Sequence, residues 1–297
     1  MTGSGMTGSG LPAVRARAAA EAGAATGGVH VRPLHGAADA AAAIALFDSV
    51  WTPEAGDRPI STELLVALAH SGNYVTGAYS GAELVGAAAG FLAAPPGQGL
   101  HSHIAAVSAA TRGRRIGLAL KLDQRAWALE AGLRTITWTY DPLVRRNAAF
   151  NLRRLRARAV EYLPDFYGVM TDSVNAGDAS DRLLVSWALA DDDVAAACEG
   201  IAAPTAPPAA EPLLAVGPDG GPLPGRAQPG QGGRGRVVSV ATPEDVEALR
   251  RERPEVARAW RVAVRDTLGE LMGRGARVVG LAPDGAYVVQ VEAEGRR

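Results

Sequence analysis

A basic, glycine-containing loop carries the clearest chemical signal in the sequence. It reads Arg112-Gly113-Arg114-Arg115-Ile116-Gly117-Leu118-Ala119 and lies between an apolar run and an amphipathic run. Small residues at Gly117 and Ala119 let the first backbone N–H groups of a helix approach an anion, and the helix dipole adds about half a positive charge there. The loop therefore predicts a pyrophosphate cradle. It lacks the Gly-Lys-Ser or Gly-Lys-Thr ending of a Walker A loop.

Two histidines flank Ser102 shortly before this loop. His101 and His103 are two residues apart in an apolar segment, and residues at this spacing on a strand point to one face of a sheet. Either imidazole can act as a base, directly or through a water, and an ordinary structural role is the alternative. Five histidines and one cysteine offer no obvious set of four ligands, so no metal is expected.

The elements that must position these residues alternate between α and β. Apolar or alternating runs predict strands at 29–34, 74–79, 83–92, 102–108, 135–140, 157–162, 182–189, 236–240, 277–281 and 286–291. Amphipathic runs predict helices at 37–51, 61–70, 117–131 and 147–155, and within 243–251 and 254–274. We therefore expect an α/β fold with a mixed central sheet flanked by helices.

Composition suggests four segments. We expect residues 1–28, which open with a repeated MTGSG, to be disordered, and residues 29–198 to form the main α/β domain. Residues 199–235, rich in Pro and Gly, are typical of a linker, and residues 236–297 are expected to form a smaller α/β extension. Trp260, Leu268 and Leu271 stand at helical spacing in this extension, which indicates packing on the first domain or on a second subunit of a homodimer.

Charge and cysteine content exclude several classes. The net charge of -1 gives no general attraction to nucleic acid or to an anionic membrane. The longest apolar stretch is shorter than the roughly 20 residues that a bilayer requires. The single Cys198 fits a reducing cytoplasm. Of the 30 basic residues only Lys121 is a lysine, so an arginine is weaker evidence of phosphate binding here than usual.

The pattern Arg114-x-x-Gly117-x-Ala119 between a strand and a helix resembles the acyl-CoA-binding motif of the GNAT superfamily of N-acyltransferases. The predicted order β, α, α, β, β, β, α, β, α matches that fold, over residues 29 to about 190. Further segments look like one bacterial GNAT-like subgroup: 137–143, 146–152, 162–168, 181–183 with Trp187, and 259–261 with Arg265.

The resemblance implies direct attack of an amine on the thioester of an acyl-CoA, without a covalent enzyme intermediate. By similarity the backbone of Ala106, Val107 and Ser108 polarises the thioester carbonyl. The residues that would hold the cofactor are Arg112, Arg114, Arg115, Ile116, Gly117, Leu118, Ala119, Asn147 and Asn151. Asn147 also stands where it can cap its helix.

One departure from the family concerns the acid. Many relatives carry a tyrosine in the helix after the fifth strand, but residues 150–155 here read Phe-Asn-Leu-Arg-Arg-Leu. If an acid is needed, Tyr140 or Tyr167 must supply it. The departure also keeps open a second hypothesis, a catalytically silent acyl-CoA sensor or partner-docking module.

The expected donor is acetyl-CoA or succinyl-CoA, and the expected acceptor is the amine of a small molecule such as an amino acid. An α-amine titrating near 8 costs about 1 kcal/mol to deprotonate at neutral pH, whereas a lysine amine costs about 4.6. Arg145 and Arg146 could bind a carboxylate or the CoA 3′-phosphate, or simply form a solvated face. Trp138 is either a substrate contact or a core residue.

Overall fold

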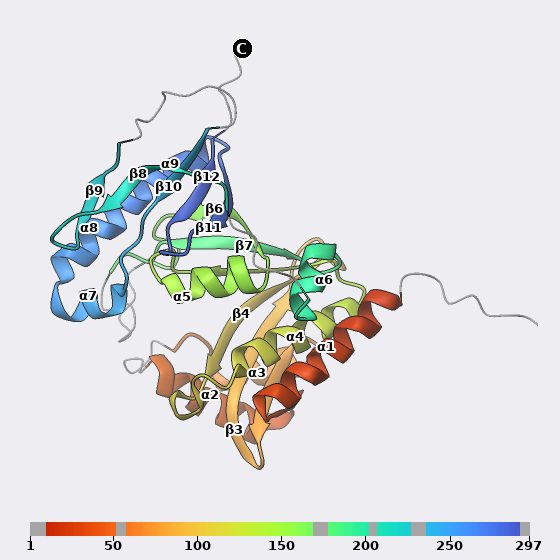
Figure 1. Cartoon of the computed structure of the whole chain (residues 1–297). Coiled ribbons are helices and arrows are strands. Elements are labelled where there is room, and N and C mark those ends of the chain that lie inside the picture. The colour runs from red at the N-terminus through yellow and green to blue at the C-terminus, as the bar shows by residue number, and fades with distance from the viewer. Residues whose placement is uncertain (1–9, 52–57, 169–177, 202–206, 227–235, 292–297) are drawn as a thin grey trace, which may run out of the picture. The chain divides into compact units, whose positions relative to one another are not determined.

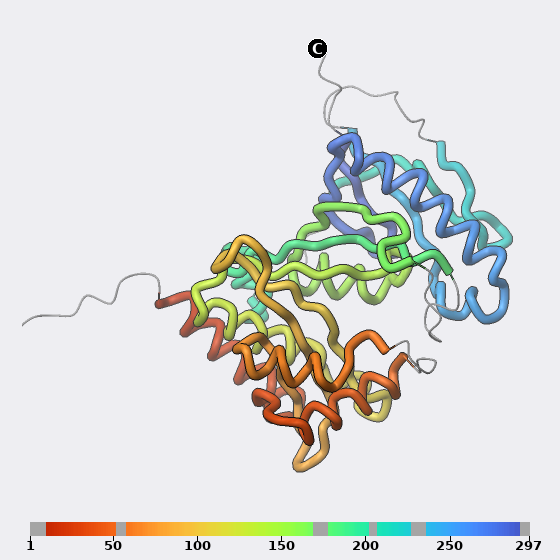
Figure 2. The backbone as a smooth tube through the Cα atoms, turned by 180° about the vertical axis from the view of Figure 1, so that it is seen from behind, coloured from red at the N-terminus to blue at the C-terminus, as the bar shows by residue number. Residues whose placement is uncertain are grey.

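The computed structural model describes residues 10–51, 58–168, 178–201, 207–226 and 236–291. Within them the fold is mixed α/β, as predicted. A seven-stranded sheet has the order β1-β2-β3-β4-β5-β7-β6, and a five-stranded sheet has the order β11-β12-β10-β8-β9. The chain divides into two compact units, residues 1–138 with 188–202 and residues 139–187 with 203–297 (Figures 1 and 2).

The first unit is built on antiparallel strands with one parallel neighbour. Its strands are β1 (His30–Pro33), β2 (Val75–Ser80), β3 (Glu83–Leu92), β4 (Gly99–Val107) and the start of β5 (Thr135–Tyr140). β1 to β4 pair antiparallel in sequence order, whereas β4 pairs parallel with β5 from Gly99–Thr135 to His101–Thr137. These strands lie within one or a few residues of the predicted ones.

Helices enclose this sheet. They are α1 (Leu11–Gly27), α2 (Gly36–Trp51), α3 (Thr62–His70), the 3₁₀ turn η1 (Ala109–Thr111), α4 (Ile116–Glu130) and α6 (Asp192–Cys198). α2 packs on β3 and β4 through a core that includes Ile44, Phe47 and Ile104. α3 begins at the predicted cap, where the Ser61 hydroxyl accepts from the Leu64 N–H at 3.2 Å.

The N-terminal helix overturns one expectation. Residues 1–28 were expected to be disordered, but Leu11–Gly27 form α1, which lies along α4 (Figure 1). Arg17 bridges α1 to Asp123 at 2.7 Å and to Glu130 at 2.8 Å, and Ala16 and Ala20 are buried. The alanine-rich segment has little amphipathic pattern of its own, so its order comes from this tertiary packing.

The second unit also departs from the predicted segmentation. Residues 211–216 and 222–224, within the expected linker, form β8 (Glu211–Val216) and β9 (Pro222–Pro224), and β8 pairs parallel with β10 (Val237–Val240). The C-terminal part is therefore not a separate extension. It forms one compact unit with residues 139–187, which were expected to belong to the first domain.

The other elements of the second unit follow the predicted pattern more closely. They are the end of β5, α5 (Arg145–Ala148), the π-helical segment η2 (Ala149–Arg154), β6 (Arg158–Leu163), β7 (Arg182–Ala188), α7 (Val246–Glu252), α8 (Pro254–Val264), η3 (Arg265–Gly269), α9 (Glu270–Gly273), β11 (Arg277–Leu281) and β12 (Tyr287–Gln290). The helix predicted at 147–155 is thus mostly π-helical, and that at 254–274 is interrupted by a π-helical turn.

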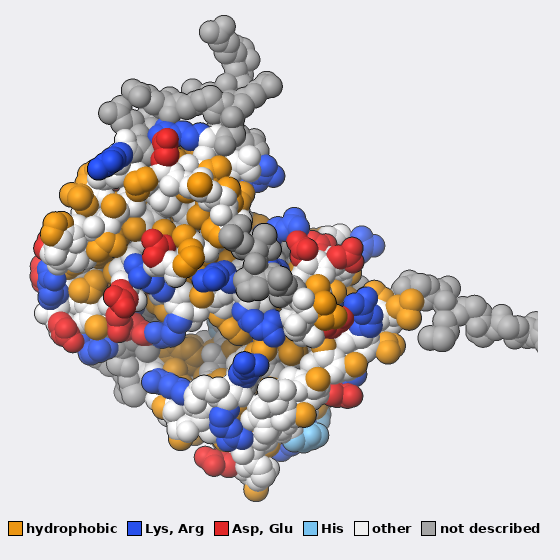
Figure 3. Space-filling model, in the orientation of Figure 1, with side chains coloured by type: hydrophobic (Ala, Val, Ile, Leu, Met, Phe, Trp, Pro, Cys, Tyr) orange, Lys and Arg blue, Asp and Glu red, His pale blue; other side chains and the backbone are white. Residues whose placement is uncertain are grey.

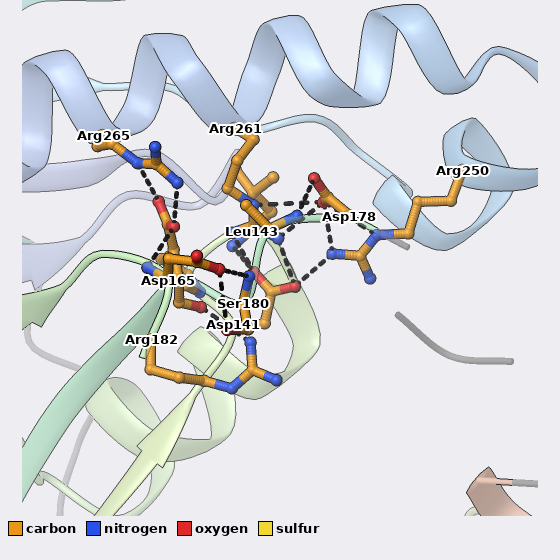
Figure 4. A network of polar contacts seen from close by, with 12 residues as sticks. Asp141, Leu143, Asp165, Asp178, Ser180, Arg182, Arg250, Arg261 and Arg265 are labelled. Carbon is orange, nitrogen blue, oxygen red and sulfur yellow. Dashed lines mark hydrogen bonds and ion pairs between the residues drawn. The ribbon is translucent and has the colours of Figure 1, made fainter. Parts of the chain in front are cut away.

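A buried ion network binds the two parts of this unit (Figure 4). Asp141, at the end of β5, accepts from Arg250 of α7 at 2.5 Å and from Arg261 of α8 at 2.8 and 2.9 Å. Asp178 pairs with the same two arginines at 3.1 and 3.0 Å. Burial alone would raise the pKa of Asp141, but the two guanidinium groups outweigh it and hold that pKa below its ordinary value.

We predict that Arg261→Met lowers the free energy of unfolding by about 3–5 kcal/mol, because it leaves two buried carboxylates with a single guanidinium partner. Urea unfolding at pH 7 measures this. Arg274→Met is the matched control, since its ion pair with Glu270 is exposed on both sides and is worth less than about 0.5 kcal/mol. Equal effects of the two substitutions would contradict a structural role of the network.

Candidate active site

The two histidines of β4 lie on one face, as predicted. The rings of both His101 and His103 contact the Phe91 ring, with centroids 5.2 and 5.9 Å away. A β-bulge shapes this segment, because Gly90 pairs with Ser102 and Ala89 with Ile104, which leaves His103 as the extra residue. The half-exposed Phe91 thus forms an aromatic platform with the two imidazoles.

Hydrogen bonds orient each imidazole. His103 Nε2 lies 3.3 Å from the Pro59 carbonyl oxygen, and since a carbonyl only accepts, the neutral ring carries its proton on Nε2 and its lone pair on Nδ1. His101 Nδ1 lies 3.3 Å from the Thr137 hydroxyl. Burial lowers the pKa of His101 below its ordinary value, and electrostatic repulsion from the neighbouring His103 and Lys121 side chains adds to the effect. A neutral His101 and a lone pair on His103 are both suited to base chemistry.

The basic loop leads into α4 through two residues with left-handed backbone, Gly113 with φ of 85° and Arg115 with φ of 61°. Arg115 is the N-cap residue, and its side chain caps no N–H group. The Arg115 carbonyl accepts from Leu118 and Ala119, which are the third and fourth residues of the helix. The start of α4 is therefore an uncapped helix N-terminus beside the exposed Arg112 and Arg115.

Gly117 has no structural reason to be a glycine. A Cβ atom placed on it meets only the Val107 side chain, at 3.9 Å, which is ordinary contact. Ile116 and Ala119 are buried beneath it, whereas Gly117 and Leu118 are partly exposed. There is therefore open space beside the first turn of α4 at Gly117, and the anion cradle at this place stays a prediction.

Arg114 has a second role that the sequence did not indicate. Its Nη2 donates to the carbonyl oxygens of Gly27 and Gly28 at 3.1 and 3.0 Å and to the Ser80 hydroxyl at 3.2 Å. These carbonyls end α1, where backbone acceptors lack partners within the helix. The side chain of Arg114 therefore holds α1, and its contribution to an anion site would come from the backbone.

The backbone expected to polarise a thioester carbonyl is held by β3. Ala106 and Val107 pair with Ala87 and Gly86, and the Ser108 N–H donates to the Val85 carbonyl at 2.8 Å. They lie at the end of β4, immediately before the loop.

Lys121, the chain's one lysine, is a feature that the sequence reasoning did not assign to the site. It is buried, with Nζ 2.9 Å from Ser102 Oγ, 3.0 Å from Gln124 Oε1 and 3.9 Å from the centroid of the Trp138 ring. Burial lowers the pKa of Lys121 to about 7. Trp138, expected as a core or substrate residue, is itself buried and packs against this amine. The feature of the sequence that could have drawn attention to this residue is that it is the one lysine among 29 arginines.

The arginines expected to bind substrate have partners inside the second unit. Arg145 donates to the Thr242 hydroxyl at 3.2 Å and also to the Thr242 carbonyl. Arg146 forms a two-pronged ion pair with Glu247 of α7, with 2.6 Å between Nη2 and Oε1. On the face drawn in Figure 3, acidic side chains lie among the basic ones, as the near-zero net charge implies.

The tyrosines and asparagines expected near the reaction also lie in the second unit. Tyr140 is buried, with its hydroxyl 3.2 Å from that of Tyr287, and burial raises its pKa. Tyr167 is 43% exposed, with its hydroxyl 3.1 Å from that of Thr139. Asn147 does not cap its helix, because α5 begins at Arg145 and the Asn147 N–H donates to Val144. Asn151 is buried in η2.

The described residues contain neither a membrane-spanning helix nor a cluster of metal ligands. None of their helices combines the length and the apolar character needed to cross a bilayer. No group of three or more His, Cys, Asp or Glu side chains in this part of the chain is arranged to hold a metal ion.

Comparison with known proteins finds similarity only at the level of structure. No protein-family model matches the chain, and no curated protein matches it significantly. Among solved structures, the ribosomal-protein-S18-alanine N-acetyltransferase of Escherichia coli is 11% identical with a TM-score of 0.45, over 55% of this chain and 95% of that one. The ribosomal-protein-S5-alanine acetyltransferase of Vibrio fischeri is 18% identical with a TM-score of 0.44, over 55% and 94%. The yncA protein of Salmonella typhimurium, solved with acetyl-CoA, is 17% identical with a TM-score of 0.44, over 55% and 95%.

We predict that Lys121 makes stability depend on pH above neutrality. Its pKa falls from 10.5 to about 7 on folding, so between these values the unfolded chain binds one more proton and stability rises with pH. At about 1.36 kcal/mol per unit, the wild-type protein should gain up to about 5 kcal/mol relative to Lys121→Met between pH 7 and pH 10.5.

Urea unfolding of both proteins at several pH values measures this gain. The other titrating groups are common to both, so they cancel in the difference. Unfolding free energies that stay parallel over the whole range would show that Lys121 keeps an ordinary pKa in the folded protein.

Proposed function

We propose that the protein is an acyl-CoA-dependent N-acyltransferase that moves an acetyl group onto the amine of a small molecule. The observation that carries this proposal is the arrangement of β4 and α4. One strand presents two imidazoles on one face, and the helix that follows it opens with an uncapped N-terminus and exposed arginines.

Acetyl-CoA would contact two places in this arrangement, the first turn of α4 and the end of β4. Its pyrophosphate would bind the N–H groups of Ile116 and Gly117 in the first turn of α4, since those of Leu118 and Ala119 donate to the Arg115 carbonyl. Arg112 and Arg115 would add positive charge. The thioester would lie against the backbone of Ala106 to Ser108, at the end of β4. Asn147 and Asn151, the other expected cofactor contacts, belong to the second unit, and their role stays a prediction from the resemblance.

The reaction is a direct transfer. The amine nitrogen attacks the thioester carbonyl carbon, the N–C bond forms and the C–S bond breaks, with no covalent enzyme intermediate. His103 accepts the amine proton at Nδ1, the atom that its Pro59 contact leaves with a lone pair. The leaving thiolate takes a proton from water. Tyr140 and Tyr167, the two expected acids, belong to the second unit, and their role stays a prediction.

An α-amine is the acceptor that suits this base. A half-buried imidazole is a modest base, and an α-amino group needs only about 1 kcal/mol to lose its proton at pH 7. Because Arg145 and Arg146 already have partners within the chain, acetyl is a better supported donor than succinyl.

We predict that Gly117→Glu abolishes acetyl-CoA binding, because a carboxylate at the first turn of α4 repels the pyrophosphate and fills the open space above it. Calorimetric titration of the full chain measures binding. Gly273→Glu is the matched control, since Gly273 is also helical and also has open space around its Cβ position. Unchanged affinity of Gly117→Glu would remove α4 from the proposal.

We predict that His103→Ala lowers kcat by a factor of about 10²–10⁴, the usual contribution of a general base, while the KM for acetyl-CoA changes little. The loss should shrink at alkaline pH, where the amine loses its proton to the solvent. Steady-state release of free thiol measures both constants.

His70→Ala, which changes an exposed histidine at the end of α3, is the control. A His103→Ala enzyme with wild-type kcat at every pH would exclude this residue as the base.

A further inference from the structure

Lys121 lies at the point where two strands of the first unit end their described pairing. The described pairing of β4 with β5 ends at His101 and Thr137. The next residues are Ser102 on β4 and Trp138 on β5. Lys121 reaches both of these from α4, with Nζ on the Ser102 hydroxyl at 2.9 Å and over the Trp138 ring at 3.9 Å. One side chain therefore joins three elements at the histidine-bearing part of β4.

Ser102 also begins the bulge in β4. It pairs with Gly90 on β3, whereas the next paired residue of β4 is Ile104, so His103 has no residue opposite it. Bulges redirect side chains next to active sites, and their geometry depends on the residues that flank them. A buried hydrogen bond to the Ser102 side chain therefore fixes the residue between the two imidazoles.

The surroundings of Lys121 are matched to an amine. Ser102 Oγ, Gln124 Oε1 and the indole face give three partners to the three protons of an ammonium, without a carboxylate among the described residues. Gln124 turns its oxygen to Lys121 although its own Nε2 then finds no acceptor in the described part of the chain. The planar guanidinium of an arginine, with five donors, would leave several unpaired here.

A lysine is unusual in this chain. All 29 other basic residues are arginine, including the buried Arg250 and Arg261, which face carboxylates. Lys121 is also buried, but its partners in the described part of the chain are neutral, as is the Leu189 carbonyl that accepts from the buried Arg125.

We propose that Lys121 is a positioning residue, which holds Ser102 and thereby orients the imidazoles of His101 and His103 for proton transfer. This inference rests on the proposed acyltransferase function for its catalytic part. The orientation of the imidazoles is a structural property, so it is testable without any turnover.

The test compares Lys121→Met with Ser102→Ala. Methionine keeps an unbranched apolar chain against Trp138 but loses both hydrogen bonds, and alanine removes the Ser102 partner alone. The readouts are the imidazole NMR signals of His101 and His103, assigned with single His→Gln variants, and steady-state constants with acetyl-CoA and an accepted amine.

Both variants should shift the two imidazole signals and lower kcat about tenfold to a hundredfold, with the KM for acetyl-CoA within about twofold of the wild-type value. In protein labelled at lysine, the single lysine signal should move in Ser102→Ala. Lys121→Arg should not restore kcat. If the folded Lys121→Met and Ser102→Ala proteins keep wild-type imidazole signals and kcat, the proposal is wrong.

Arg125→Met is the matched control. Arg125 is a buried cation four residues along the same helix, where it donates to the Leu189 carbonyl at 2.9 and 2.7 Å. Its loss should leave the imidazole signals unchanged, and shifts as large as those of Lys121→Met would assign the effect to α4 in general. If no amine is acylated by the wild-type protein, the proposed function fails, while the imidazole shifts still decide the role of Lys121.

Discussion

The tight connection between β4 and α4 is the constraint on which the candidate site depends. The chain must leave the sheet at Val107 and begin a helix at Ile116 that packs back on β3 and β4. It does so through left-handed backbone at Gly113 and Arg115, and the second of these is strained for a residue with a side chain. The same turn leaves the N-terminus of α4 without a side-chain cap. A single local feature thus provides both the reversal of the chain and the helix end at which we propose that the pyrophosphate binds.

The two units stabilise buried cations in different ways. In the second unit, Arg250 and Arg261 lie between Asp141 and Asp178, so charge balances charge in the interior. In the first unit the partners of Lys121 among the described residues are neutral, and its lowered pKa reflects the cost of burying its charge. A network in which the charges balance stabilises the second unit. Arg125 in the same unit as Lys121 also donates to a neutral group, the Leu189 carbonyl, so it is the contact of Lys121 with Ser102, between the two histidines of β4, that we assign to function.

Much of the first unit was predictable because its signals are local. The β3 strand, the Ser61 cap and the shared face of His101 and His103 follow from period-two alternation and capping chemistry. α1 was not predictable, because its alanine-rich sequence is ordered by tertiary contacts such as those of Arg17 with α4 and of Arg15 with Glu199. The role of Arg114 at the end of α1 was hidden for the same reason.

In the second unit, the features that the sequence did not predict are contacts between residues far apart in the chain. The partners of Asp141 lie 109 and 120 positions away in the chain, and no local pattern indicates such pairs. Pro and Gly suggested a linker where β8 and β9 form, since strand pairing with β10 outweighs a weak local propensity.

The most direct test of the proposed acyl transfer is to incubate the wild-type protein with acetyl-CoA and a mixture of amino acids, and to follow free thiol and new amides together. We expect thiol release that depends on the amine and equals the amount of N-acetylated product. Tight binding of acetyl-CoA with no amine-dependent release would instead indicate a sensor, and the absence of binding would contradict the assignment of the cradle at α4.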